Sequence, residues 1–135
     1  MAVLSLKDAS ITINSVDLSD RANSVTVNYE IDSIEVTAFG SVGHIFAGGL
    51  QNNSCEISLM QDYATSNVED TVYGLVGTTT TLAIKATSGA TSATNPLYTI
   101  SSAFLSAHTP VAGAVGEVAM TTLSFTGGTI VKTTS

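Results

Sequence analysis

The sequence predicts a single, mainly β domain with one short helix. Apolar and polar residues alternate with a period of two in several segments, which is the pattern of half-buried strands. Only one segment has apolar residues at helical spacing. The chain has 135 residues, which leaves room for one hydrophobic core and not two, so we expect residues 1–135 to form one domain.

The first half of the chain begins with two short strands and a longer one. Paired apolar residues within residues 11–18 predict a hairpin that turns at Asn14-Ser15. Residues 24–31 read S-V-T-V-N-Y-E-I, an alternation that predicts a half-buried strand. The apolar series then continues with its phase shifted by one residue, so we expect a bulge or a tight turn near Asp32-Ser33.

Alternation predicts further strands in the rest of the chain. Cys55 alternates inward with Ile57 and Leu59, which predicts a strand and a buried, inert thiol. Later strands are expected at about residues 82–86, 97–108 and 118–126.

One segment, at about residues 66–76, is predicted to be the helix. Ser66 followed by Glu69 matches a capping box, and apolar residues from Val68 to Val76 recur at helical spacing. Gly77 supplies the expected stop. A helix of about ten residues is marginal alone in water, so it must pack on the sheet.

Two loops are predicted, and they differ in character. Residues 88–95 are small and polar, which is typical of a flexible connection. Residues 39–51 contain four glycines together with large apolar side chains, which exposed loops rarely carry. This glycine-rich loop either folds back on its own core or docks into a neighbouring subunit. The candidate contact residues are Phe39, Val42, His44, Ile45, Phe46 and Leu50.

Composition favours self-association and argues against binding to nucleic acid. Charged residues make up 11% of the chain, against roughly 25% in soluble domains. A surface with so few charges suggests that partners cover much of it. The net charge is −7, and the four cations, Lys7, Arg21, Lys85 and Lys132, are scattered, whereas a nucleic-acid site needs them clustered.

The cysteine count and the length of the apolar runs indicate the compartment in which the protein folds. Cys55 is the single cysteine, so no disulfide within the chain and no cysteine zinc site are expected. The first residues do not resemble a secretory signal, and no apolar run approaches the 18 residues or so of a membrane span. We therefore expect a protein that folds in a cytoplasm and has no membrane partner.

No motif for catalysis, metal binding or cofactor binding is present. A nucleophile elbow, a phosphate-binding loop and a dinucleotide fingerprint are all missing. Neither His44 nor His108 has a ligand neighbour in the sequence, so both are expected at the surface or in an interface. We expect no enzyme activity and no cofactor.

Several phrases, in order, resemble the major tail tube proteins of long-tailed, siphovirus-type bacteriophages. An Asp17-Leu18-Ser19 phrase is followed by residues 33–40, S-I-E-V-T-A-F-G, and by residues 47–50, A-G-G-L. Asn95-Pro96-Leu97-Tyr98 and Gly116-Glu117 come later, and the resemblance covers about residues 16–127. Each phrase alone is weak, and it is their order and spacing that are specific.

The resemblance implies a β-sandwich or barrel-like tail tube fold with one short flanking helix. It implies six subunits in a ring, and rings stacked into a tube through which the genome leaves the virion. The glycine-rich loop would contact the next ring. Expected partners are further copies of the chain, the tape measure, terminator and distal tail proteins, and DNA as passing cargo; the expected location is the virion tail, assembled in the host cytoplasm.

The acidic residues of the polar strand faces have two interpretations. They could form a catalytic carboxylate pair, but the chain has no Trp to make a sugar platform. An acidic wall facing the lumen is favoured, because weak repulsion keeps DNA from adhering. The residues expected there are Glu30, Glu35 and Glu56. Alternative functions are a capsid decoration protein, a tail terminator or a secretion-system tube protein.

Overall fold

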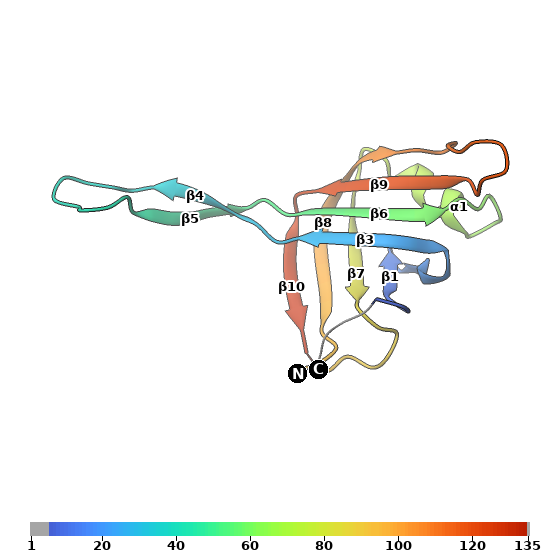
Figure 1. The fold of residues 1–135 in the computed structure, drawn as a ribbon, viewed down its shortest axis with the longest axis horizontal. Coiled ribbons are helices and arrows are strands. Elements are labelled where there is room, and N and C mark those ends of the chain that lie inside the picture. The colour runs from blue at the N-terminus through green and yellow to red at the C-terminus, as the bar shows by residue number, and fades with distance from the viewer. Residues whose placement is uncertain (1–5, 135) are drawn as a thin grey trace.

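A computed structural model of the chain describes residues 6–134, and it is mainly β with one short helix (Figure 1). An antiparallel sheet of eight strands forms the body, and two further strands form a separate sheet. The strands are β1 Ser10–Ile13, β2 Val16–Asp17, β3 Ala22–Asn28, β4 Ile31–Glu35, β5 Phe46–Gln51, β6 Ser54–Met60, β7 Thr79–Lys85, β8 Leu97–His108, β9 Met120–Thr126 and β10 Thr129–Thr133. The helical elements are η1 Ser19–Arg21, α1 Val68–Val72 and η2 Tyr73–Leu75.

The large sheet folds over on itself into two layers. Its strand order is β2-β1-β7-β8-β9-β6-β3, and β10 also pairs with β8. Strands β1, β7 and β10 run roughly across the direction of β3, β6 and β9 (Figure 1). This is the orthogonal type of sheet packing, in which one strand turns the corner and serves both layers.

Strand β8 makes that corner. Its first part pairs with β10, whereas its last part pairs with β9. Ser102, between the two parts, has a φ of 60°, which is left-handed backbone that a non-glycine residue rarely adopts. The turn between β9 and β10 lies directly against this bend, at Gly128.

The core lies between the two layers and under α1. The predicted inward residues of β6 are among the buried ones, which confirms the alternation there. Each fully buried Val, Leu, Ile or Phe side chain contributes about 1.5–3 kcal/mol through removal from water. The core consists of Ile11, Ile13, Leu18, Cys55, Ile57, Leu59, Val68, Val72, Leu82, Ile84, Ile100, Ala103, Leu105, Leu123 and Phe125.

Cys55 provides a direct check of this core. Its side chain is buried, and burial raises the pKa of the thiol to about 12, with a smaller contribution from Glu56. We expect iodoacetamide to leave the folded protein unmodified at pH 8, because the reactive thiolate is both scarce and shielded. The same reagent should modify Cys55 fully in urea, as read by mass spectrometry. Rapid modification without denaturant would contradict the buried position.

The predicted hairpin at the start of the chain and the predicted irregularity near Asp32-Ser33 are both confirmed. Asn14 and Ser15 have φ values of 50° and 67°, the geometry of the type I′ turn that joins two-residue hairpins. The pairing of β4 with β5 shifts register between Ile31 and Ser33. The strand predicted over residues 24–31 is instead β3, which ends at Asn28, and β4 begins at Ile31.

The helix is present, but its predicted cap is wrong. Asn67 is the N-cap, and its side-chain oxygen accepts a hydrogen bond from the Val68 N–H at 3.1 Å. Ser66 lies one residue earlier with a φ of 61°, and its N–H donates to the Asp70 carboxylate at 2.8 Å. Asn and Ser cap equally well, so the sequence alone could not choose between the two neighbours. The α-helix is also shorter than expected, because the chain tightens into η2 after Val72.

The later strands match the prediction except at the end of the chain. Residues 97–108 form one strand, β8, as expected, and residues 88–95 connect it to β7. The strand predicted from residue 118 begins at Met120. Strand β10 was not predicted, because its adjacent Ile130 and Val131 break the alternation and only Ile130 packs toward the core.

Candidate functional site

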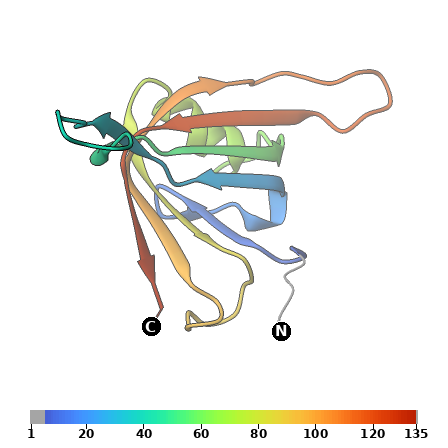
Figure 2. The same ribbon diagram turned by 60° about the vertical axis from the view of Figure 1, so that its left-hand side comes forward.

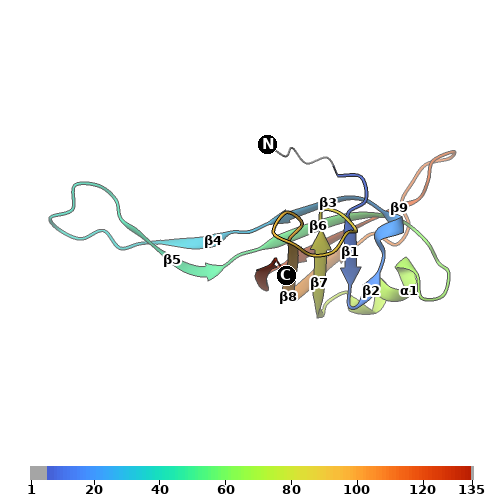
Figure 3. The same ribbon diagram turned by 90° about the horizontal axis from the view of Figure 1, so that it is seen from below.

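The most unusual feature of the structure is a hairpin that projects far from the body. Strands β4 and β5 pair only with each other, and they extend along the long axis of the molecule (Figures 1 and 3). The helix α1 and the β8–β9 connection lie at the opposite end, where the connection extends past the ends of β3 and β6 (Figure 2). The prediction of a loop over residues 39–51 is therefore wrong in part, because Phe46–Gln51 is a strand.

One of the glycines that suggested a loop, Gly49, has a packing role in this strand. Gly48 and Gly49 lie against the side chains of Ile31 and Ile34 from β4. A Cβ atom on Gly49 would come within 3.0 Å of the Ile34 Cδ1 atom and 3.2 Å of the Asp32 carbonyl oxygen. Glycine here makes room for a bulky neighbour on the paired strand, which is a use of glycine in strands that composition does not reveal.

The large apolar side chains of the hairpin are all exposed. Phe39 and Val42 at its tip are as accessible as in an extended peptide, and Leu50 is 80% exposed. None of the hairpin's residues belongs to the core, so folding back on the subunit's own core does not occur in this structure. The exposed apolar residues of the hairpin are Ile31, Ile34, Val36, Phe39, Val42, Ile45, Phe46 and Leu50.

The tip of the hairpin is ordered by its own polar contacts. The Thr37 hydroxyl donates to the Glu35 carboxylate at 3.0 Å and accepts the Ile45 N–H at 2.8 Å. His44 Nδ1 contacts the same Glu35 carboxylate, and the His44 ring centroid lies 6.5 Å from that of Phe46. These contacts place the His44 and Phe46 rings close together, whereas Phe39 and Val42 remain free.

The base of the hairpin is held by a buried amide, a role that the sequence did not suggest. Asn53 is 1% exposed, and its side-chain oxygen accepts the Glu30 N–H at 3.2 Å. Its amide nitrogen donates to the Gln51 side chain at 2.9 Å and to the Gly128 carbonyl at 3.0 Å. Buried polar groups with every partner in place rigidify the structure around them. Asn53 therefore fixes where the hairpin leaves the body.

Such a hairpin has the properties of a docking element. A two-stranded hairpin with no third strand or helix packed on it is marginally stable in water. A large contiguous apolar surface on a soluble protein marks an interaction site. Each Å² of apolar area that a contact removes from water contributes about 25 cal/mol to the free energy of binding. The hairpin can therefore bind a complementary apolar surface on another protein.

The three acidic residues expected on a lumen wall do not come together. Glu56 lies on β6 and points away from the core, directly across from Thr26 on β3 and Ser124 on β9. Glu30 lies between β3 and β4, and Glu35 lies in the hairpin. The outer face around Glu56 consists of small polar side chains from β3, β6 and β9, namely Ser24, Thr26, Asn28, Ser54, Ser58, Thr122, Ser124 and Thr126.

His108, which was expected at the surface or in an interface, has a side chain that is almost wholly buried within the subunit. Its side chain is 3% exposed, and its Nε2 atom lies 2.9 Å from the Glu69 carboxylate. Its Nδ1 atom lies 2.9 Å from the hydroxyl of Thr121. Hydroxyl, imidazole and carboxylate are thus aligned as in a hydrolase triad. Thr121 is fully buried, however, so no substrate could reach its hydroxyl, and the array serves to hold α1 against β8 and β9.

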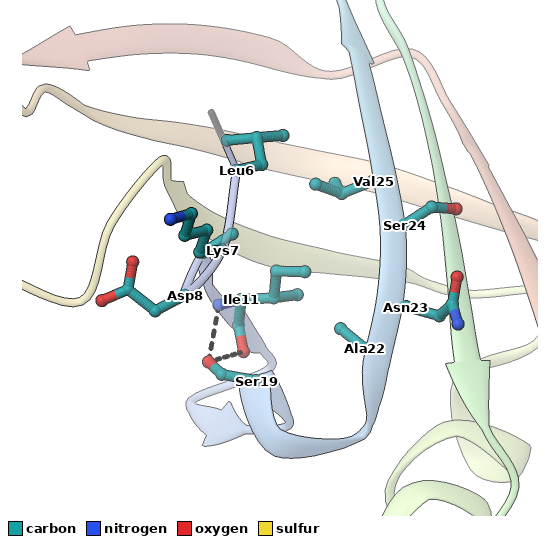
Figure 4. Close-up of a pocket in the computed structure, with 10 residues that line it drawn as sticks. Leu6, Lys7, Asp8, Ile11, Ser19, Ala22, Asn23, Ser24 and Val25 are labelled. Atoms are coloured by element: carbon teal, nitrogen blue, oxygen red, sulfur yellow. Dashed lines mark hydrogen bonds between the residues drawn. The ribbon is translucent and has the colours of Figure 1, made fainter. Parts of the chain in front are cut away.

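The described residues form no metal cluster, and they line a small cavity beside β3. Within residues 6–134, no three His, Cys, Asp or Glu side chains are grouped to hold a metal ion. A cavity of about 110 Å³ lies between Leu6–Ala9 and β3, where the Ser19 hydroxyl bonds the backbone of Ile11 (Figure 4). In the described part of the chain, no helix has the length and apolar character needed to cross a membrane.

Comparisons with known proteins show the fold. No protein-family model matches the sequence, and no curated protein is similar to it in sequence. A chain from the virion of a native gene transfer agent particle has a TM-score of 0.74 at 12% identity, with 97% of this chain and 99% of that chain covered. A chain of the tube-terminating cap of the anti-feeding prophage has a TM-score of 0.74 at 12% identity, with 100% and 93% covered.

A third similar structure comes from a contractile particle. A chain of the sheath-tube complex of an extracellular contractile injection system has a TM-score of 0.72 at 10% identity, with 98% of this chain and 93% of that chain covered. Likeness at such low identity establishes a shared fold. The chain therefore has the general tail-tube fold of phage-like particles, over nearly its whole length.

Proposed function

We propose that this chain is the structural subunit of a phage tail tube of the long, siphovirus type. Six copies form a ring, the rings stack, and the genome leaves through the resulting channel. The observation that carries the proposal is a tail-tube fold with a large apolar hairpin that its own subunit leaves uncovered. The subunit is a structural protein and not an enzyme, and it needs no cofactor.

Open strand edges support closure into a ring. Within residues 6–134, strand β3 pairs only with β6, and β10 pairs only with β8, so each presents an edge that no described strand covers. A free edge is a template for pairing with another chain. Head-to-tail contacts that repeat through a rotation close into a ring when the rotation divides a full turn. Six copies joined edge to edge would remove these edges.

Projection of the hairpin supports stacking of the rings. It extends along the long axis, away from the helix end of the body (Figure 3). In a stack of identical rings, an element at one pole meets the next ring. The contact residues are those of the predicted set: Phe39, Val42, His44, Ile45, Phe46 and Leu50.

The small polar face of β3, β6 and β9 is suited to line the channel. Its side chains are Ser, Thr and Asn around Glu56, and no lysine or arginine lies between Arg21 and Lys85. A duplex passing such a wall finds no cation to bind its phosphates. Glu30 and Glu35 would extend the acidic character toward the next ring.

Neutralising these carboxylates tests the wall assignment. We expect the triple variant Glu30→Gln, Glu35→Gln, Glu56→Gln to assemble as the natural chain does, because the wall assignment turns all three exposed carboxylates toward the channel and not toward a neighbouring copy. The measurement is the yield and diameter of assembled particles in negative-stain electron microscopy. Failure to assemble, with circular dichroism unchanged, would place at least one of the three carboxylates in a subunit contact.

The proposed partners follow from the position in the tail. They are further copies of the chain, the tape measure inside the tube, and the terminator and distal tail proteins at its ends. DNA is passing cargo, and no membrane is involved. The protein is located in the virion tail and is assembled in the host cytoplasm.

A tube-terminating role is the second candidate, because one similar structure is a tube-terminating cap. Negative-stain electron microscopy of the purified full chain over a range of concentrations separates the two. A tube subunit should form hollow tubes or hexameric rings that stack. Single rings that never stack would favour a terminator, and head-bound trimers would favour a decoration protein.

A further inference from the structure

A second apolar surface lies at the open seam of the body. Val27 of β3 and Tyr29, just after that strand, line a groove of about 640 Å³ together with Tyr98 of β8 and with Ile130 and Lys132 of β10. A water molecule occupies about 30 Å³ in the liquid, so the groove has room for several side chains. In the described part of the chain, β3 and β10 do not pair with each other, so no ladder between these two strands closes the groove.

The groove carries one positive charge. Lys132 forms none of the ion pairs found within residues 6–134, and it stands at the edge of an otherwise apolar and aromatic wall. An occupant of matching chemistry would present aliphatic side chains and a single carboxylate.

One face of the β4–β5 hairpin has that chemistry. Ile34 pairs with Ala47, and the Val36 N–H donates to the Ile45 carbonyl at 2.8 Å, so Ile34, Val36 and Ile45 share a face. Each of the three is about half exposed. The Asp32 Cβ atom lies on the same face, over Gly49, and the Asp32 carboxylate takes part in no ion pair within residues 6–134. We call these four residues the aliphatic face.

We propose that the groove of one copy receives the aliphatic face of the hairpin of a second copy, with Asp32 against Lys132. The proposal rests on the proposed function, because it specifies which surfaces meet when the subunits assemble. The contact buries apolar area on both sides and pairs two charges that are otherwise unpartnered. Complementary charges of this kind fix register and suppress other pairings.

Another apolar surface could compete for the hairpin. Tyr73, Val76, His108 and Pro110 line a depression of about 390 Å³ at the helix end of the body. None of these four residues is a lysine or arginine, and His108 is bonded to the Glu69 carboxylate. Asp32 of the hairpin would therefore find no lysine or arginine among the lining residues of this depression. The groove with Lys132 offers it an opposite charge and is the surface that we assign to the hairpin.

Disulfide trapping between two singly substituted proteins tests the pairing. Asp32→Cys is mixed with a tagged Lys132→Cys protein, assembled and oxidised, and heterodimers are read on a non-reducing gel. Cys55 is buried and stays silent. We expect a heterodimer that forms in assembled particles and not in dilute, unassembled protein. Tyr73→Cys in place of Lys132→Cys is the matched control, and it should give at least tenfold less heterodimer.

Charge exchange gives an independent measure. Lys132→Glu alone and Asp32→Lys alone should each reduce particle yield by roughly tenfold or more, and the double variant should recover it. Circular dichroism confirms that each variant is folded. Recovery in the double variant cannot arise from misfolding, so it separates a contact from a general loss of stability.

The outcomes distinguish this inference from the function on which it rests. Particles that form while position 32 cross-links to position 73 would overturn the groove pairing and leave the tube function standing. Absence of heterodimer in well-formed particles, together with no recovery in the charge exchange, would overturn it as well. Absence of any particles from the natural chain would instead contradict the tube function.

Discussion

Replacing Phe46 with Asp should abolish tube growth and leave the subunit folded. Phe46 is 60% exposed and makes no contact with the core, so the substitution removes nothing that the isolated domain needs. In an assembled contact, the same change would bury a carboxylate without a partner. We expect the critical concentration for assembly to rise at least about 30-fold, since loss of a central apolar anchor typically costs about 2 kcal/mol or more.

Two matched variants show whether the effect belongs to the hairpin. Phe46→Leu keeps an apolar side chain and should assemble, with a modest loss at most. Ala93→Asp places the same charge on the exposed β7–β8 connection and should also assemble. The critical concentration is measured by pelleting and checked by electron microscopy. Normal tube growth by Phe46→Asp would contradict the role of the hairpin, and unfolding of this variant would place Phe46 in the core.

Gly128→Ala should have the largest effect on the stability of the subunit. Gly128 has a φ of 86°, and a Cβ there would overlap the Ser101 carbonyl oxygen and lie 3.1 Å from the Ser102 carbonyl carbon. Both obstacles are backbone atoms of the β8 corner, so they cannot swing aside as a side chain could. We expect a loss of about 3–5 kcal/mol from left-handed strain and overlap together.

Gly127→Ala is the matched control for this prediction. Gly127 has a similar φ of 75°, but its Cβ would meet no atom within 4 Å. Its cost should be limited to backbone strain, about 1–2 kcal/mol. In thermal denaturation, Gly128→Ala should therefore lower Tm by about 10 °C or more, roughly twice the effect of the control or greater. Equal effects of the two substitutions would show that the turn does not pack on the corner as described.

Local sequence patterns predicted those elements that place one regular face on the core. Strands β6 and β8 and the Asn14-Ser15 turn follow directly from alternation and turn chemistry, because each has one face on the core or needs a special φ. Strand β5 was predicted as a loop because Gly48 and Gly49 are poor strand formers, and the reason for glycine at position 49 is the close approach of Ile34 and Asp32 on the partner strand. A contact between distant segments of this kind leaves no local signal.

The candidate site was predicted in part for the same reason. The apolar content of residues 39–51 indicated an interaction element, and the structure places these side chains at the surface. Their role as contact residues stays a prediction. The buried amide of Asn53 and the buried imidazole of His108 were not foreseen, because each draws its partners from elements far apart in the sequence. Composition around either residue is ordinary.

A three-dimensional reconstruction of the assembled particle by cryo-electron microscopy tests the central claim most directly. The account predicts a hollow tube of stacked six-membered rings in which the β4–β5 hairpin of each copy is enclosed by neighbouring copies. Phe39, Val42 and Phe46, exposed in the single subunit, should then be buried. A tube whose rings meet through other surfaces, with the hairpin still exposed to solvent, would contradict it.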